Sequence, residues 1–223
     1  MARINLKAGA LTAPLPPVLV TVRSGGVSNI ITIGWTGILA TSPPKTYISV
    51  RPSRHSHKML GESREFVINL PTAALAPAVD YCGIYTGAKV DKFKKCALTE
   101  VESLEVGAPT IAECPIAIEC RVTDITHMGT HDVFSADIVS VSCDECIMDK
   151  KGKIRYDKAD LLAYVHGVYY SLGKMLGKFG FSTDKSEDPS RRIARAVKER
   201  KEKSAYVKKE RLGGLVKNEA GQR

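Results

Sequence analysis

The stretch from Gly34 to Leu60 reads GWTGILATSPPKTYISVRPSRHSHKML and places the chain's only tryptophan, Trp35, before a loop of small residues and prolines. A β-branched segment follows and ends in RPSRHS, where cationic and hydroxyl side chains are concentrated. A phosphate is bound by Arg or Lys together with hydroxyls and backbone N–H groups. A flat ring system needs an apolar or aromatic surface. The stretch therefore predicts a site for an aromatic ring system that carries a phosphate.

Each half of this interpretation has a simpler alternative. Arg51, Ser53, Arg54 and Ser56 could form a solvated basic loop before a short helical turn. A single tryptophan such as Trp35 is most often a core or interface residue. The two halves become informative together, because a flavin mononucleotide needs both a ring surface and a phosphate site.

The histidines and cysteines indicate no metal centre. No nearby Asp, Glu or Cys completes a site with His55 and His57, and a hairpin does not bring His127 and His131 to one face as a helix would. The single C-x-x-C, at 143–146, has no second pair at zinc-ribbon spacing. We expect its cysteines to be buried as small apolar residues at a strand end.

The first two-thirds of the chain are typical of a barrel or sandwich. Short β-branched or alternating segments bounded by Gly or Pro predict strands at 18–22, 29–35, 46–50, 65–70, 116–125 and 132–142. The last two form a hairpin around Gly129. Residues 72–87 have a helical pattern interrupted at Pro77, and residues 160–180 mix helix formers with glycines at helix-packing spacing. No Rossmann or P-loop glycine motif is present.

Charge is concentrated at the end of the chain. From Lys185 to Arg223 there are 13 Lys and Arg against 6 Asp and Glu, which accounts for +7 of the net charge of +9. The interspersed acidic residues favour a charged helix over a nucleic-acid-binding tail, which remains the weaker alternative. No apolar run is long enough to span a membrane, and prolines interrupt the N-terminal apolar residues. We therefore expect a cytoplasmic protein.

The order of several stretches resembles the flavin reductase-like, FMN-binding split-barrel family, and more narrowly its flavoredoxin branch. The similarity begins with PLPPVLVTVRSGGVSNIITI at 14–33, includes the stretch at 34–60, and continues through EFVINLP, DYCGIYTGAKVDKF, GTHDVFSADIVSV and YYSLGKMLGKFGFS. It covers roughly residues 10–183. The resemblance implies a mainly β (α+β) fold: a six-stranded Greek-key split barrel with peripheral helices that pairs as a homodimer. It also divides the chain into an FMN-binding domain at 1–183 and a basic, helical extension at 184–223.

The resemblance implies roles for particular positions. The flavin ring would be lined by Asn29, Trp35, Thr36 and Gly37. The phosphate would be held by Ser53, Arg54 and Ser56, and the residue composition adds Arg51 to this group. Lys92, which would otherwise be interpreted as one solvated lysine, would add positive charge on the phosphate and ribityl side. His131 would approach the flavin, and Tyr164 would supply an aromatic edge.

The expected function is that of an FMN-dependent oxidoreductase. It would exchange electrons with NAD(P)H as a reductase, or with a ferredoxin-like donor as a carrier, and the sequence does not separate these two cases. FMN supplies the reactive atoms, so no protein nucleophile or catalytic acid–base pair is needed. The alternative is a non-enzymatic module whose basic tail docks on nucleic acid or on an acidic protein. The physiological acceptor, the role of the C-x-x-C and the role of the tail stay open.

Overall fold

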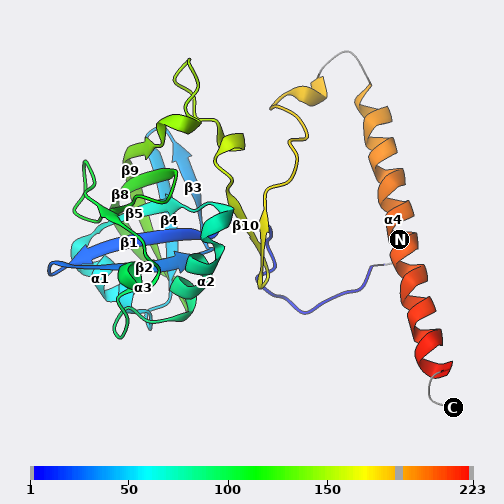
Figure 1. The fold of residues 1–223 in the computed structure, drawn as a ribbon, viewed down its shortest axis with the longest axis horizontal. Helices are drawn as coiled ribbons and strands as arrows, with labels where there is room; N and C mark the ends of the chain where they lie inside the picture. Colours follow the sequence, from blue (N-terminus) through cyan, green and yellow to red (C-terminus); the bar gives the residue numbers. More distant parts are fainter. Residues whose placement is uncertain (1–2, 184–187, 221–223) are drawn as a thin grey trace. The chain divides into compact units, whose positions relative to one another are not determined.

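The main sheet of the computed structural model is antiparallel and has seven strands in the order β2-β1-β5-β8-β9-β4-β3 (Figure 1). In chain order these are β1 (Val18–Ser24), β2 (Val27–Ile33), β3 (Thr36–Thr41), β4 (Pro44–Val50), β5 (Glu65–Leu70), β8 (Ile116–His127) and β9 (Asp132–Cys143). β4 lies beside β9 although β5 and β8 come between them in the chain, which is a Greek-key order. The predicted mainly β fold is confirmed.

The two edges of this sheet are brought together by a very short connection. The edge strands β2 and β3 are consecutive, and only Gly34 and Trp35 join them. Three Cα-to-Cα steps span at most about 11 Å, so the sheet has to curl until its edges approach each other. The Ser49 N–H on β4 donates to the Trp35 carbonyl at 2.9 Å. The result is a barrel with a seam, formed by Gly34, Trp35 and the adjoining ends of β2 and β4.

Two segments differ from the sequence prediction. The small residues after Trp35, expected to be a loop, form β3 against β4, so the sheet has seven strands instead of six. Residues 160–180 contain the hairpin β10 (Leu162–Val165) and β11 (Val168–Ser171), not a helix. Gly167 forms the turn of that hairpin with φ of +95°. Residues 172–178 have no regular secondary structure, and the helix packing predicted for their glycines is therefore wrong.

Short elements fill the connections between the strands. They are α1 (His55–Ser63), η1 (Ala73–Leu75), α2 (Ala76–Ile84), α3 (Lys92–Lys95), β6 (Glu100–Val101), β7 (Thr110–Ile111), η2 (Glu145–Ile147) and η3 (Tyr156–Lys158), whereas η4 (Phe181–Thr183) follows the last strand. Pro77 lies in the first turn of α2, where a helix needs no N–H from it. It therefore begins this helix instead of interrupting it.

Burial on both faces explains why β1 has an almost continuous apolar sequence. Val20 and Val22 point into the barrel interior with Phe66 and Phe134. Leu19, one position out of phase, packs in a second cluster that includes residues of α2 and α3. Burial of apolar area stabilises a fold by about 25 cal/mol per Å². Both clusters bury apolar area of β1 and therefore stabilise it from both faces. β1 is consequently a fixed support for β2, which lines the site described below.

The structure describes residues 3–183 and 188–220, and these divide into two units. Residues 10–173 form the unit that contains the barrel, and residues 1–9 with 174–223 form the other. The basic tail contains the long helix α4 (Pro189–Ala220). The domain boundary expected between 183 and 184 adjoins residues 184–187, which lie outside the described residues.

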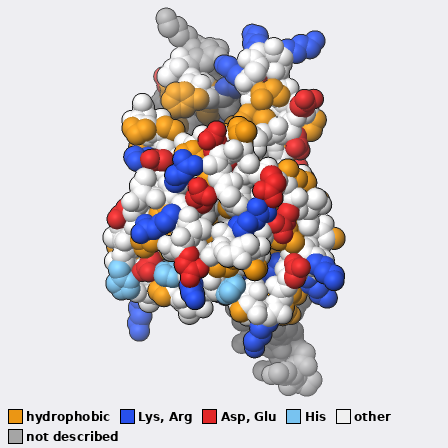
Figure 2. All heavy atoms as spheres, turned by 90° about the vertical axis from the view of Figure 1, so that its left-hand side faces the viewer, with side chains coloured by type: hydrophobic (Ala, Val, Ile, Leu, Met, Phe, Trp, Pro, Cys, Tyr) orange, Lys and Arg blue, Asp and Glu red, His pale blue; other side chains and the backbone are white. Residues whose placement is uncertain are grey.

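The surface combines charges of both signs. Figure 2 shows Lys and Arg side chains interspersed with Asp and Glu over the face that it presents. Within the described residues, no helix is both long and apolar enough to cross a membrane. Cys143 is half-buried and Cys146 is exposed, so the burial expected for the C-x-x-C is wrong for Cys146.

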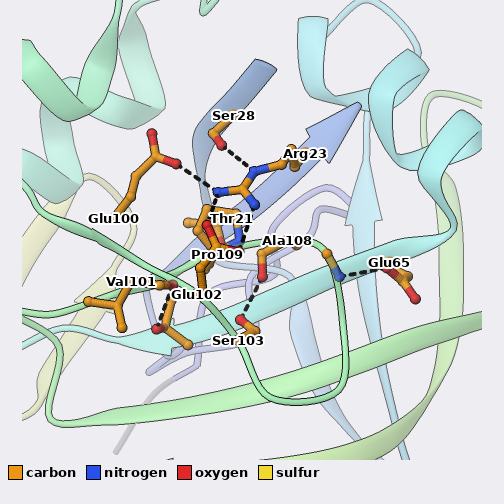
Figure 3. A network of polar contacts seen from close by, with 12 residues as sticks. Thr21, Arg23, Ser28, Glu65, Glu100, Val101, Glu102, Ser103, Ala108 and Pro109 are labelled. Carbon is orange, nitrogen blue, oxygen red and sulfur yellow. Dashed lines mark hydrogen bonds and ion pairs between the residues drawn. The ribbon is translucent and has the colours of Figure 1, made fainter. Parts of the chain in front are cut away.

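A polar network fastens the segment before β7 to the barrel (Figure 3). The Arg23 guanidinium donates to Glu102 at 2.9 Å and to Glu100 at 3.2 Å, and its Nε donates to the Ser28 hydroxyl at 3.0 Å. The buried Thr21 hydroxyl donates to the Pro109 carbonyl. Because Ser28 belongs to β2, these contacts also brace the strand that carries Asn29, a predicted site residue.

Candidate functional site

The larger of two adjoining cavities lies at the seam of the barrel and has a volume of about 330 Å³. Its walls are the ends of β2 and β4, helix α2, and hairpin β10–β11. The ends of strands in a curled sheet leave side chains uncovered. The cavity forms where the ends of β2 and β4 meet at the seam. A volume of this size falls within the range of small-molecule sites.

One wall of the larger cavity is an aromatic pair. Trp35 is 41% exposed, and its ring lies 4.4 Å from the His131 ring, centroid to centroid, at an interplanar angle of 43°. Arg51 Nε lies 3.4 Å from His131 Nε2. Burial and the Arg51 charge lower the pKa of His131, against an opposing effect of Asp132. The lowered pKa favours a neutral imidazole beside the indole, and the two tilted rings form one aromatic wall.

A second part of the lining is built around the β10–β11 hairpin. Leu15 and Tyr164 exchange two backbone hydrogen bonds, of 2.9 and 2.8 Å, which tie the N-terminal segment to β10. The Tyr164 and Tyr169 rings lie 5.2 Å apart, and the Tyr169 hydroxyl donates to Asp80 at 3.3 Å. Burial raises the pKa of Tyr169 to about 12, and the Asp80 charge adds to this effect. Tyr169 is thus a neutral donor that orients a carboxylate at the cavity.

The smaller cavity, of about 60 Å³, shares the lining residues Ile31, Arg54 and Gly83 with the larger one. Its lining includes Ser53, Arg54, His55, Ser56, Thr86 and Lys92, and no Asp or Glu is among the described residues that line it. Two of these side chains, His55 and Ser56, begin α1, and Ser53 and Arg54 directly precede it; the N-cap of this helix makes no side-chain hydrogen bond. Helix N-termini and cationic side chains favour anions. This cavity can therefore hold a phosphate.

The floor of the smaller cavity is a buried polar contact between β2 and α1. Asn29 Nδ2 donates to the Ser56 hydroxyl at 2.7 Å, and both side chains are buried. Gly87 passes directly over this pair, because a Cβ at this position would lie 2.0 Å from Asn29 Oδ1. Only a glycine allows the backbone this close approach. Asn29, expected from the sequence to line a ring, is instead placed with the candidate phosphate residues.

Lys92 is buried, which makes its interpretation as a solvated lysine wrong. Its ammonium donates to the Ile30 carbonyl at 2.6 Å and to the Cys82 carbonyl at 2.8 Å. Two of its three N–H groups are thus used, and within the described residues the third has no protein acceptor. Desolvation lowers the pKa of Lys92, with a smaller contribution from Arg54 in the same direction. An anion in the smaller cavity would stabilise the charged form.

The structure brings nine of the eleven predicted site residues to the two cavities. Trp35, Arg51, His131 and Tyr164 line the larger cavity, Asn29, Ser53, Ser56 and Lys92 line the smaller one, and Arg54 lines both. Thr36 and Gly37 are absent from both linings. The Thr36 hydroxyl instead donates to the Tyr47 carbonyl at 2.6 Å, and Gly37 pairs with Tyr47 across β3 and β4.

Sequence reasoning missed several lining residues: Leu15, Asp80, Gly83, Gly87 and Tyr169. Most of them carry no local signal, because Asp80 meets Tyr169 across 89 residues of chain. Gly87 is the exception. It lies in the stretch YTGAK, where a glycine two residues before a lysine could have indicated a close approach to an anion.

A family model described as "Flavin reductase like domain" matches residues 11–173. The chain belongs to the flavin reductase-like family. The match includes every residue that lines the two cavities. Membership confirms the family resemblance that the sequence stretches indicated, and the predicted split-barrel fold is confirmed with it.

Solved structures and a curated relative agree with this assignment. The flavoredoxin of Desulfovibrio vulgaris (Miyazaki F) is 30% identical, with a TM-score of 0.77 over 82% of this chain and 100% of the other. A flavoredoxin from Methanosarcina acetivorans is 26% identical, with a TM-score of 0.74 over 84% and 99%. A protein of Bradyrhizobium diazoefficiens named FMN reductase (NADH) RutF is 24% identical over 160 residues, which are 67% of this chain and 80% of the relative.

Proposed function

We propose that this family member binds FMN across the two adjoining cavities and transfers electrons through it as a flavin-dependent oxidoreductase. The observation that carries the proposal is the division of the site. A cavity with an aromatic wall adjoins a smaller one lined by hydroxyl and cationic side chains, as a ring joined to a phosphate requires.

The residues present fit FMN on two further counts. Lys92 keeps one N–H without a protein acceptor at the smaller cavity, within the described residues, and the start of α1 adds a helix N-terminus there. Trp35 and His131 give the larger cavity an aromatic wall that a flat ring can contact. We assign Ser53, Arg54, Ser56 and Lys92 to the phosphate and Trp35, His131 and Tyr164 to the ring.

Bound FMN supplies the redox chemistry, by two-electron or one-electron transfer. The protein's own residues bind and orient it. Arg51 places a positive charge at the larger cavity, which favours the negative charge of a reduced flavin and raises its potential. The buried Asn29–Ser56 contact fixes the start of α1 against β2. It therefore keeps the distance between the phosphate donors and the aromatic wall constant. Thr36 and Gly37 act indirectly in this assignment, by pairing β3 with β4 next to Trp35.

The electron donor is either a nicotinamide nucleotide or a redox protein. The name of the RutF relative supports NADH, and the flavoredoxin structures support a carrier. The test is the visible spectrum of the purified protein, followed by anaerobic addition of NADH or NADPH. Flavin bands that bleach promptly indicate a reductase. Bands that bleach only with dithionite or a reduced ferredoxin indicate a carrier, and a protein that cannot be reconstituted with FMN refutes the proposal.

A homodimer is part of this proposal. β3 is an edge strand, and its Ile38 and Leu39 are 67% and 52% exposed beside Trp35. An apolar edge strand is a ready surface for a second chain. A second copy on this edge would cover both side chains and the open side of the seam. Light scattering of the wild type and of an Ile38→Lys variant tests this, with a monomeric variant expected.

The basic helix α4 favours an acidic redox partner over nucleic acid. Four glutamates are interspersed among its Lys and Arg residues, which weakens binding to a polyanion but permits docking on an acidic protein surface. Deleting residues 188–223 is expected to slow electron exchange at low salt and to leave FMN bound. Loss of nucleic-acid binding in a protein that never holds flavin would favour the binding-module alternative. We propose the cytoplasm as the location.

A further inference from the structure

One carboxylate outside both cavities holds two histidines from different parts of the chain. Asp132 Oδ2 lies 2.7 Å from His57 Nε2, and Asp132 Oδ1 lies 2.6 Å from His127 Nδ1. The Asp132 side chain is 14% exposed, whereas that of His127 is 71% exposed. Each carboxylate oxygen thus has its own imidazole partner: His57, which is mostly buried, and His127, which is exposed.

The three residues connect the two halves of the proposed cofactor site. His57 follows Ser56 in the first turn of α1, where the candidate phosphate donors are. Asp132 follows His131, whose ring lies against Trp35. The carboxylate therefore links the phosphate side to the ring side with a single side chain.

The backbone does not make this link by itself. The pairing of β4 with β9 ends at Val50 and Asp132, and the chain then leaves β4 through Arg51 toward α1. From that point on, the contacts of α1 with β9 depend on side chains. The His57 ring also packs edge-on against the buried Phe134 ring, with a centroid distance of 5.2 Å and an interplanar angle of 77°. Asp132 thus holds an imidazole whose other face is already immobilised.

The charge state of the group fits this role. Hydrogen bonds from His127 and His57 lower the pKa of Asp132, so it is ionised at neutral pH. A hydrogen bond to an ionised acceptor is about twice as strong as a neutral one. The link between α1 and β9 is therefore stronger than the neutral side-chain contacts around it.

We propose that Asp132 is a positioning residue that sets the phosphate-binding start of α1 relative to the ring cavity, acting through His57. His127 holds the second carboxylate oxygen and so fixes the orientation of Asp132. The inference rests on the proposed FMN site and adds to it a residue that touches neither the ring nor the phosphate. It predicts that Asp132 matters for a flavin that carries a phosphate and not for one that lacks it.

The test compares FMN with riboflavin, which has the same ring and no phosphate. Wild type, Asp132→Ala and the control Asp124→Asn are titrated with both flavins by fluorescence. Asp124 is exposed on β8 and contacts Thr126 in the same hairpin, away from α1. We expect Asp132→Ala to weaken FMN binding about tenfold, the effect of one charge-assisted hydrogen bond. Riboflavin binding is expected to stay within about twofold, and Asp124→Asn to match wild type with both flavins.

A double-mutant cycle separates positioning from general destabilisation. His57→Ala is expected to weaken FMN binding as much as Asp132→Ala, and the double variant is expected to be no worse than either one. Asp132→Asn keeps the side-chain shape without the charge, and it replaces Asp132→Ala if that variant does not fold. It is expected to show the same selectivity for FMN with a smaller loss.

The failures are distinguishable. Equal losses for FMN and riboflavin, or additive effects of His57 and Asp132, would overturn the positioning role and leave the FMN proposal standing. Unchanged FMN binding in Asp132→Ala and His57→Ala would also overturn the positioning role and leave the FMN proposal standing. Wild-type protein that binds neither flavin would instead overturn the proposed function.

Discussion

Replacing Gly87 with alanine tests the most confined contact of the site. A Cβ at this position would lie 2.0 Å from Oδ1, 2.5 Å from Cγ and 2.8 Å from Nδ2 of Asn29. Such distances force the amide to move, and because Asn29 lies in the paired strand β2, its side chain has to rotate. That rotation breaks the 2.7 Å hydrogen bond from Asn29 to the Ser56 hydroxyl. The backbone itself accepts alanine, since Gly87 does not have a positive φ.

The magnitude follows from the burial of the broken pair. Asn29 is 5% exposed and Ser56 is 1% exposed, so neither partner regains a water molecule easily. Leaving buried polar groups unpaired costs about 1–3 kcal/mol. For a domain of this size that corresponds to a decrease in melting temperature of about 2–12 °C. FMN affinity is expected to fall by about tenfold or more, because Ser56 lies at the candidate phosphate cavity.

The assay is chemical denaturation of the apoprotein together with FMN titration. Gly61→Ala in α1 is the matched control, because a Cβ there meets nothing within 4 Å. Replacing a glycine inside a helix is expected to stabilise the protein by about 0.5–1 kcal/mol. Asn29→Ala gives a second comparison, since adding Gly87→Ala to it should have little further effect. If Gly87→Ala matches wild type in both stability and FMN affinity, the reasoning from this contact is refuted.

Three further variants probe the rest of the site. Trp35→Ala is expected to weaken binding of FMN and riboflavin alike by about tenfold, with little change in melting temperature, because the indole is already 41% exposed; equal flavin affinity would remove it from the ring site. Lys92→Met is expected to weaken FMN binding by about 10- to 100-fold by removing a charged donor, while riboflavin titration reports any general damage. Hydrogen bonds from His127 and His57 hold the pKa of Asp132 below its ordinary value of 3.8. The ionised carboxylate therefore stabilises the fold above about pH 3.8, and this stabilisation is lost as the pH falls through the pKa of the folded state. Wild type should therefore lose unfolding free energy more steeply than Asp132→Asn between about pH 4 and pH 2, and parallel pH profiles would contradict this.

Local sequence predicted the parts of the protein that depend on local structure. The period-2 pattern of β8 and the turn at Gly129 define a hairpin within one segment, so the pairing of β8 with β9 could be predicted. The cluster from Arg51 to Ser56 becomes the start of a helix for the same reason, and its residues converge because they are neighbours in the chain. The ring role predicted for Trp35 came from the family resemblance, and the structure places Trp35 in the lining of the larger cavity. The order of these segments along the chain was enough to predict the family and the class of cofactor.

Tertiary structure decided which residues face the cavities and which are buried. Lys92 is buried because α3 packs against β2 and gives it two carbonyls from residues 62 and 10 positions away. The contact between Gly87 and Asn29, the bond from Tyr169 to Asp80, and the link from Asp132 to His57 likewise join segments far apart in the chain. β3 became a strand because the free edge of β4 supplied partners that outweighed its own glycine and the prolines that follow it. The physical reason is common to all of these: hydrogen bonding and desolvation depend on neighbours that are determined only when the barrel closes at its seam.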